Sequence, residues 1–260
     1  MKLPLYWIDA FTAKPFHGNP AGVVPLEKWL PDEVMQHVAF ENGLAETAFF
    51  VRTGPDRFHL RWFTPEIEMD LCGHATLASA FTLFRELNQP GPQVTFDSRS
   101  GPLVVTRRDD LLELDFPSLP ATKAEVTAAL AGALGARPEQ VAGARDTLCV
   151  FARAEDVLAL RPDFAAIARL DTFALIASAP GRDCDFISRF FAPRAGVNED
   201  PATGSSHCTL VPYWADRLGK TKLQARQVSA RGGEFFCELR GDRVGIAGRA
   251  VLYLRGEIHI

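Results

Sequence analysis

One pattern occurs twice in this chain, first as Arg61-Trp62-Phe63-Thr64-Pro65 and again as Arg189-Phe190-Phe191-Ala192-Pro193. Each copy is followed by a loop that contains an acid, Asp70 in the first copy and Asp200 in the second. A pattern that recurs in this way indicates an internal repeat, and a repeat constrains the whole fold. We therefore expect two similar halves.

Each copy continues into a glycine at an expected helix start, within Cys72-Gly73-His74-Ala75-Thr76 and within Thr203-Gly204-Ser205-Ser206. The helices expected there, 75–87 and 206–218, are apolar on nearly all sides, and such helices are normally surrounded by other structure. We therefore expect an α+β fold of two pseudo-symmetric halves. Each half would be a curved, mostly antiparallel sheet or barrel around one central helix.

Short runs of aromatic, aliphatic and β-branched residues between turn formers predict the strands. They cover residues 5–10, 47–52, 58–63, 94–97, 103–107 and 111–116, and then 147–151, 172–177, 185–191, 235–239, 244–247 and 250–254. Further helices are expected from Pro31 onward, near 125–134 and near 163–168. Two prolines within 114–125 mark a crossing, so the expected domains are 1–117 and 118–260, with a last strand that could pack back onto the first half.

The bulk composition is that of an ordinary globular protein, with 47% hydrophobic and 23% charged residues among 260. A formal net charge of −4 without runs of like charge argues against nucleic acid or an anionic membrane surface as a partner. No segment reaches the length of about 18 apolar residues that a membrane helix needs. Pro4 and Asp9 interrupt the N-terminal apolar run, which argues against a signal peptide and for the cytoplasm.

The cysteines argue against a disulfide framework and a structural zinc site, because their number is odd and no C-x-x-C pair occurs. They are Cys72, Cys149, Cys184, Cys208 and Cys237. His207 and Cys208 have no second histidine four residues on and no nearby pair of carboxylates, so we expect no metal site. The chain also lacks a Walker pattern, a G-x-G-x-x-G motif after a strand and an evident Schiff-base lysine, so we expect no cofactor.

The two expected helix starts offer an anion site. Gly73 and His74 at one start, and Gly204 and Ser205 at the other, supply backbone N–H groups that the helices leave unpaired. If the two starts face each other, these groups and the helix dipoles converge on a negative charge such as a carboxylate. The alternative is a duplication that is kept only for packing.

The chain resembles the PhzF family of phenazine-biosynthesis isomerases, which has the diaminopimelate epimerase-like fold. The residues that carry the resemblance are Asp9-Ala10-Phe11-Thr12, Phe16-His17-Gly18-Asn19-Pro20-Ala21-Gly22-Val23, Glu41-Asn42, Glu46-Thr47-Ala48-Phe49, both copies of the repeat, Asp70 to Thr76, and Glu199 to Ser205. The resemblance implies an active site in a cleft between two halves, a role in a biosynthetic process, no cofactor and usually a homodimer.

Glu46 lies just before an expected apolar strand, where a glutamate is ordinarily a solvated surface residue. Its resemblance to the glutamate of the family implies that it is the general acid/base. A carboxyl group partly buried by Phe49, Phe50 and Trp62 would have a raised pKa and could both take and return a proton. One carboxylate that acts on one face of a substrate suits a hydrogen shift.

Cys72 carries a competing hypothesis. Epimerases and racemases of this fold place two thiols on opposite faces of a carbon acid, but the counterpart of Cys72 in the repeat is Thr203, whose hydroxyl is a poor base. Two-base inversion is therefore disfavoured. A helix start could still lower the pKa of Cys72, so a dehydratase with a single thiol stays open, as does a purely structural cysteine at a tight turn.

The remaining candidates are polar residues near the repeats. His74 could cap the helix or donate to the substrate, and Asp200 could cap a helix and hold its loop or bind His74 or the substrate. The resemblance favours catalytic roles for both. Asn19 serves turn geometry and could also touch the substrate, as could Gly73, Thr203, Gly204 and Ser205.

The sequence therefore predicts an isomerase that moves a proton within a small carboxylate-bearing substrate, with Glu46 as acid/base and His74 and Asp200 as its partners. Two alternatives stay open. One is an epimerase, racemase or dehydratase that depends on Cys72, and the other is a non-catalytic protein that binds a small molecule.

Overall fold

A computed structural model describes residues 1–260. The chain divides into two compact units: unit 1 comprises Met1–Asp115 and Ala247–Ile260, and unit 2 comprises Phe116–Ile246. The boundary expected from the sequence, after residue 117, falls two residues later than this division, and the last strand belongs to unit 1. No helix is both long and apolar enough to cross a membrane.

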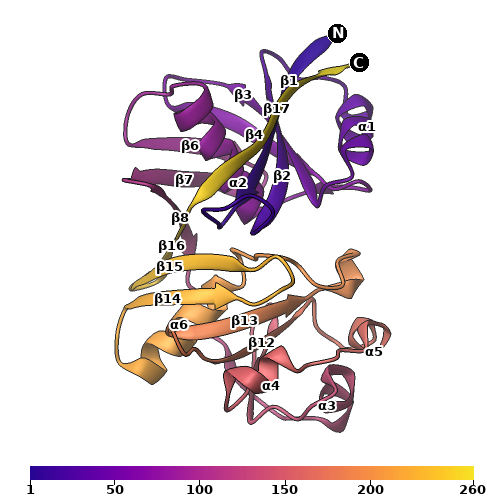
Figure 1. The fold of residues 1–260 in the computed structure, drawn as a ribbon, viewed down its shortest axis with the longest axis vertical. Coiled ribbons are helices and arrows are strands. Elements are labelled where there is room, and N and C mark those ends of the chain that lie inside the picture. Colours follow the sequence, from indigo (N-terminus) through magenta and orange to yellow (C-terminus); the bar gives the residue numbers. More distant parts are fainter. The chain divides into compact units, whose positions relative to one another are not determined.

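Unit 1 is a sheet with two helical segments. Its elements are β1 (Lys2–Ala10), β2 (Asn19–Leu26), α1 (Asp32–Asn42), β3 (Glu46–Arg52), β4 (Arg57–Phe63), β5 (Glu68–Met69), α2 (Gly73–Phe81) with its π-helical extension η1 (Thr82–Glu86), β6 (Gln93–Ser98), β7 (Gly101–Arg108), most of β8 (Leu111–Pro117), and β17 (Ala250–His259). The strands pair in the order β17-β1-β2-β3-β4-β6-β7-β8, and β5 pairs with β4. Both termini lie side by side because β1 pairs with β17 (Figure 1).

Unit 2 has its own set of strands and helices. Its elements are β9 (Thr122–Ala124), α3 (Ala128–Leu134), β10 (Gln140–Gly143), β11 (Thr147–Val150), α4 (Ala154–Leu158), α5 (Phe164–Ala168), β12 (Leu175–Pro180), β13 (Phe186–Phe191), the 3-10 turn η2 (Pro193–Ala195), α6 (His207–Leu218), β14 (Lys222–Gln227), β15 (Gly233–Arg240) and β16 (Arg243–Gly248). Its strands pair in the order β9-β10-β11-β12-β13-β14-β15.

The same pairing pattern occurs in both units. In unit 1, β1 is antiparallel to β2, β2 parallel to β3, β3 antiparallel to β4, β4 parallel to β6 and β6 antiparallel to β7. In unit 2, the strands β10, β11, β12, β13, β14 and β15 follow the same sequence of directions. The expected α+β repeat is therefore confirmed at the level of strand topology.

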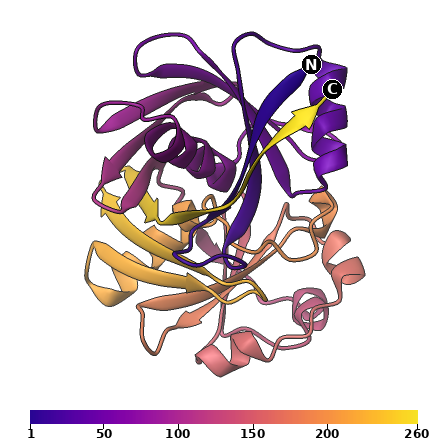
Figure 2. The same ribbon diagram turned by 45° about the horizontal axis from the view of Figure 1, so that its top comes forward.

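Helix α2 is the central element of unit 1. Every residue from Gly73 to Ala80 is buried, and the helix packs against β1, β2, β3 and β17, which curve around it (Figure 2). Thr76, Ser79 and Thr82 satisfy their buried hydroxyls by donating to the carbonyl four residues earlier, at 2.6, 2.8 and 3.0 Å. The helix can therefore be buried on all sides without unpaired hydroxyl groups.

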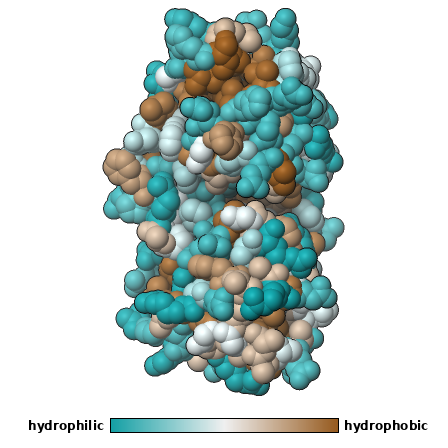
Figure 3. All heavy atoms as spheres, turned by 90° about the vertical axis from the view of Figure 1, so that its right-hand side faces the viewer, coloured by the Kyte–Doolittle hydropathy of each residue, from teal (hydrophilic) through white to brown (hydrophobic).

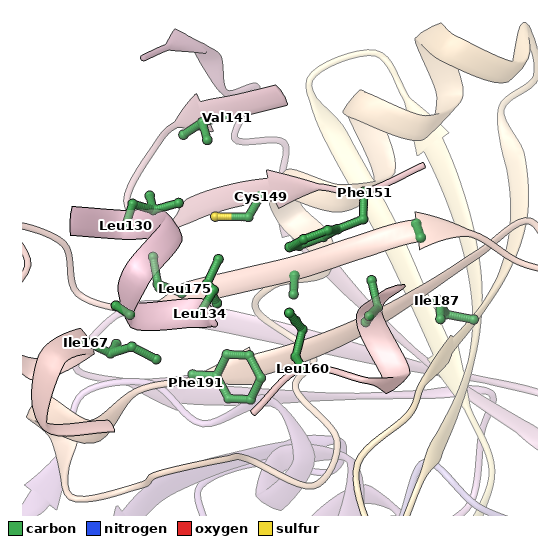
Figure 4. Close-up of a cluster of buried hydrophobic side chains, with 14 of the residues drawn as sticks. Leu130, Leu134, Val141, Cys149, Phe151, Leu160, Ile167, Leu175, Ile187 and Phe191 are labelled. Atoms are coloured by element: carbon green, nitrogen blue, oxygen red, sulfur yellow. The ribbon is translucent and has the colours of Figure 1, made fainter. Parts of the chain in front are cut away.

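Helices α1, α3, α4 and α5 pack on apolar side chains of the sheets. In unit 1, Met35, Val38 and Ala39 of α1 pack on apolar side chains from β1 to β4. In unit 2, α3, α4 and α5 lie over a core that includes Leu134, Cys149 and Phe191 (Figure 4). Hydrophobic side chains also gather at the surface of unit 1 over the end that carries α1 and the termini (Figure 3).

Each copy of the repeated sequence forms a partly buried ion pair. Arg61 donates through Nε and Nη2 to Glu68 at 2.6 and 2.8 Å, and Arg189 donates through the same atoms to Glu199 at 2.8 and 2.9 Å. The partner acid in the first loop is therefore Glu68, whereas Asp70 is exposed. Arg189 also donates to the carbonyls of residues 157 and 160. Each arginine–glutamate pair ties the strand that carries the arginine to the loop that follows this strand.

The structure also contains strands that the sequence did not predict. Strand β2 includes Pro20 and Pro25, and prolines argue against a paired strand because they lack an N–H donor. Strand β14 reads Lys-Leu-Gln-Ala-Arg-Gln, which has few β-branched or aromatic residues. The strand expected at 172–177 begins at Leu175, because the Thr172 hydroxyl donates to the Ala174 carbonyl within a turn.

We expect Arg189→Met to lower the free energy of unfolding by roughly 2–4 kcal/mol, because it leaves Glu199 largely buried without its partner. The matched control is Arg57→Met. Arg57 also binds a carboxylate through two nitrogens, that of Asp97, but this pair is solvent-exposed. Urea unfolding measures the free energy of unfolding of both variants. An equal loss of this free energy in the two variants would contradict a role for the Arg189 pair in holding its loop.

Candidate active site

Glu46 is the first residue of β3 and is paired in register with Ala21 of β2. The preceding helix α1 ends at Gly43, whose φ of 61° permits the left-handed turn that leads back to the sheet. Asn42 then donates to the Thr47 hydroxyl at 3.1 Å, which fixes the start of β3. The side chain of Glu46 is only 15% exposed, so it is not the solvated acid that is ordinary at a strand edge.

Asn19 is the first residue of β2 and is fully buried. The loop before it depends on Gly18, whose φ is +65° and where a Cβ atom would lie 2.1 Å from the carbonyl oxygen of Ala10. Only glycine fits such a position. Gly18 therefore allows the chain to return to β1 and to place Asn19 inside unit 1.

Cys72 and His74 flank the first residue of α2, Gly73. The first hydrogen bond of the helix runs from the N–H of Thr76 to the carbonyl of Cys72, at 3.2 Å. The N–H groups of Gly73, His74 and Ala75 are thus not used by the helix ladder. Both the Cys72 and the His74 side chains are buried.

These residues converge on the ring of His74. Its Nε2 lies 3.1 Å from Oε2 of Glu46, and its Nδ1 lies 3.2 Å from the amide nitrogen of Asn19. Sγ of Cys72 lies 3.5 Å from Nδ1 and 4.0 Å from Nε2. The Oε2 atom of Glu46 is buried and makes no hydrogen bond, because His74 meets it at ion-pair distance without hydrogen-bond alignment.

The contact with Asn19 assigns the ring proton of neutral His74. The amide nitrogen of Asn19 donates, so Nδ1 of His74 accepts and the ring proton resides on Nε2, the atom nearest Glu46. Protonation of Nδ1 requires the amide of Asn19 to turn so that its oxygen accepts. Asn19 therefore positions His74 from within the unit, rather than acting from an exposed turn.

Burial raises the pKa of the Cys72 thiol, and the negative charge of Glu46 raises it further. His74 and the N–H of Ala75 favour the thiolate but do not outweigh these two effects. The helix start therefore does not lower the pKa of Cys72, a possibility that the sequence left open. Desolvation dominates because the thiol lies wholly inside the unit.

Two opposing effects act on His74. Burial alone would lower the pKa of its imidazole, but the negative charges of Cys72 and Glu46 beside it raise it well above its ordinary value. Because Cys72 is held as a neutral thiol, we assign the raised pKa of His74 to the Glu46 carboxylate. The imidazolium and the carboxylate stabilise each other.

The second group of predicted residues lies in unit 2. Thr203 donates its hydroxyl to Oδ2 of Asp200. Gln227, at the end of β14, donates to the Asp200 carbonyl at 2.6 Å and to the Thr203 hydroxyl at 3.1 Å, and its oxygen accepts from the Thr203 N–H at 2.8 Å. Gln227 was missed by the sequence analysis because its strand was missed, and it holds the loop that carries Asp200.

Gly204 and Ser205 form a turn before α6, which begins at His207. The N–H of His207 donates to the Gly204 carbonyl and that of Cys208 to the Ser205 carbonyl, at 3.0 and 3.1 Å. His207 itself stacks on Phe235 at 3.9 Å, and burial lowers its pKa to about 4, so it is a neutral core histidine.

The structure thus brings together Asn19, Glu46, Cys72, Gly73 and His74 within unit 1. It brings together Asp200, Thr203, Gly204 and Ser205 within unit 2. One ligand atom from each of Glu46, Cys72 and His74 lies within 4.8 Å of the other two, which makes them a possible metal-ligand set that the sequence analysis did not anticipate. Glu46 and Cys72 are 26 positions apart along the chain, and Cys72 and His74 are two positions apart. This spacing matches no sequence pattern that indicates a metal site.

Known proteins resemble this chain along its whole length. A family model described as phenazine biosynthesis-like protein, PhzC-PhzF, matches residues 8–256. A Pseudomonas aeruginosa protein named as an uncharacterized isomerase is 52% identical over 261 residues, which cover 100% of both proteins.

Solved structures give the same result. The crystal structure of a phenazine biosynthesis protein of the PhzF family from Enterococcus faecalis matches with a TM-score of 0.98 and 46% identity, and the match covers 100% of both chains. A hydroxyproline epimerase from Agrobacterium vitis matches with a TM-score of 0.63 over 99% of this chain and 92% of that chain. At 10% identity the second match shows the fold alone, and it confirms the expected epimerase-like architecture.

We expect Glu46→Gln to lower the pKa of His74, because it removes the charge that opposes desolvation. In the wild type, the raised pKa adds stability that is fully present below the ordinary histidine pKa of 6.5 and is lost as the pH rises through the folded-state value. The Glu46→Gln variant lacks this added stability at low pH. NMR titration of the His74 ring measures its pKa, and urea unfolding at several pH values measures the stability. An unchanged His74 titration would contradict the assignment of the raised pKa to Glu46.

Proposed function

The chain belongs to the phenazine biosynthesis-like (PhzC-PhzF) family and is an isomerase by class, and we propose that it moves a proton within a small carboxylate-bearing substrate, with Glu46 as the general acid/base. The observation that carries the proposal is the buried Oε2 atom of Glu46, which makes no hydrogen bond. Its lone pairs are available to a proton on carbon, and burial keeps water from competing for them.

His74 supports this chemistry from one side. In the neutral ring the Nε2–H is the ring donor nearest Glu46, so the ring can stabilise the carboxylate before it takes a proton and can polarise a substrate group beside it. Asn19 holds this neutral tautomer by donating to Nδ1, and its amide turns so that its oxygen accepts when the ring is charged. Glu46 and His74 therefore act as a pair, and Asn19 is a positioning residue.

The start of α2 supports a carboxylate as the binding group of the substrate. The N–H groups of Gly73, His74 and Ala75 do not enter the helix ladder, and the first turn contains no acidic residue that would repel an anion. The helix dipole adds a favourable field at this end. A substrate carboxylate at this helix start would lie beside the Glu46–His74 pair.

We extend the proposal to the second group of residues. Asp200, held by Thr203 and Gln227, would accept a hydrogen bond from a polar group of the substrate, and the turn at Gly204 and Ser205 would offer N–H groups. The reaction moves a proton and no electrons, so it needs no redox cofactor. The family resemblance further implies a homodimer in the cytoplasm and a role in biosynthesis, which remain part of the proposal.

The alternative, an epimerase or dehydratase that uses Cys72, is weakened by two observations. The raised pKa keeps the thiol protonated near neutral pH, and a thiol is a poor base. The counterpart hydroxyl of Thr203 donates to Asp200 and accepts from Gln227. A pair of thiol bases is therefore not available in this chain.

The test is deuterium incorporation from solvent into members of a library of small carboxylic acids, followed by mass spectrometry. We expect exchange to fall at least about 100-fold in Glu46→Gln, the usual scale for loss of a general base. Cys72→Ala should retain most of the exchange. The proposal fails if Cys72→Ala alone abolishes exchange.

The matched control is Glu86→Gln. Glu86 is also a largely buried glutamate, but its carboxylate pairs with Arg255 and it lies on η1, outside the site. The Glu86→Gln variant should leave the rate of deuterium exchange unchanged. A library in which some acids raise the melting temperature but none exchanges would instead favour the non-catalytic binding protein.

A further inference from the structure

The residues around His74 have a second chemical property that proton transfer does not require. A thiol, an imidazole nitrogen and a carboxylate oxygen are the three kinds of side-chain ligand that proteins use for zinc. Here one atom of each kind, from Cys72, His74 and Glu46, lies within 4.8 Å of the other two. From this geometry we propose that the cluster binds one Zn²⁺ ion and, resting on the proton transfer proposed above, that the bound ion inhibits the isomerase.

The distances fit a tetrahedral ion after small movements. With bonds of ~2.0–2.3 Å, the ligand atoms of tetrahedral zinc lie about 3.3–3.6 Å apart. Nε2 of His74 is 3.1 Å from Oε2 of Glu46 and 4.0 Å from Sγ of Cys72. The two pairs that include Nε2 therefore lie within about half an ångström of this range, and the third pair, Cys72 with Glu46, lies within 4.8 Å before any side-chain rotation.

The buried Oε2 atom of Glu46 gives a second indication that this cluster binds a cation. It is buried without a hydrogen bond, and a cation between it and the ring would satisfy it. The Glu46 side chain is 15% exposed, so the cluster is not wholly sealed from solvent. Three protein ligands also leave a fourth position of zinc for water or a substrate carboxylate.

Asn19 supplies the outer support that metal-binding histidines usually have. When zinc binds Nε2, the ring proton moves to Nδ1, and the amide of Asn19 turns so that its oxygen accepts this proton. The thiol proton of Cys72 passes to solvent as the sulfur–zinc bond forms. The bound ion then occupies the lone pair of Glu46 that would take the substrate proton, which is the reason for inhibition.

The experiment titrates purified, chelator-treated protein with Zn²⁺ alone in competition with a chromophoric chelator, and repeats the titration with Co²⁺ to detect thiolate-to-metal absorption. We expect one ion per chain and a thiolate band. Cys72→Ser should weaken zinc binding by more than about 100-fold, because even outer-shell changes weaken metal sites by 10–100-fold. Circular dichroism checks that the variant is folded.

The control is Cys184→Ser, because Cys184 is the most accessible of the other cysteines. It should leave affinity and stoichiometry unchanged. The zinc proposal is overturned if the wild type binds no zinc, or if Cys72→Ser binds it as tightly as the wild type does. No substrate enters the titration, so this outcome would leave the proton-transfer proposal intact. Loss of the proton-transfer proposal would remove the reason for inhibition but leave zinc binding intact.

Discussion

The site depends on one buried imidazole whose two nitrogens have different partners. Asn19 donates to Nδ1 of His74, and the ring proton on Nε2 lies toward Glu46, at 3.1 Å. This arrangement decides which atom carries the ring proton, and it leaves one carboxylate oxygen without a hydrogen bond. Burial alone would lower the pKa of His74, so the ion pair with Glu46 is what keeps a charged ring possible.

The fold holds these side chains on rigid elements. Asn19 and Glu46 begin two parallel neighbouring strands, and His74 lies in the first turn of a helix that those strands enclose. Elements of this kind fix a side chain more narrowly than a loop does. The same strand topology recurs in unit 2, where the loop before α6 is held by Gln227 and by the pair of Arg189 with Glu199.

The sequence predicted the elements with strong local signals. The repeat at Arg61 and Arg189 and the apolar helices predicted the two similar units. The family resemblance predicted Glu46, which no residue pattern would have selected. The buried role of Asn19 was missed because Pro20 argues against a strand, although β2 begins at Asn19. The sequence left open a lowered pKa for Cys72, because a helix start is visible in sequence, whereas the complete burial that raises this pKa is not.

The most direct test is the protonation pattern of His74 in the folded protein. ¹⁵N NMR of histidine-labelled protein, with His74 assigned from the spectrum of His74→Gln, distinguishes a proton on Nε2 from one on Nδ1. At a pH where the ring is neutral, the account predicts the proton on Nε2, and it predicts that Asn19→Ala weakens this preference. A proton on Nδ1 in the wild type would contradict the account, because the ring would then direct a lone pair rather than a proton toward Glu46.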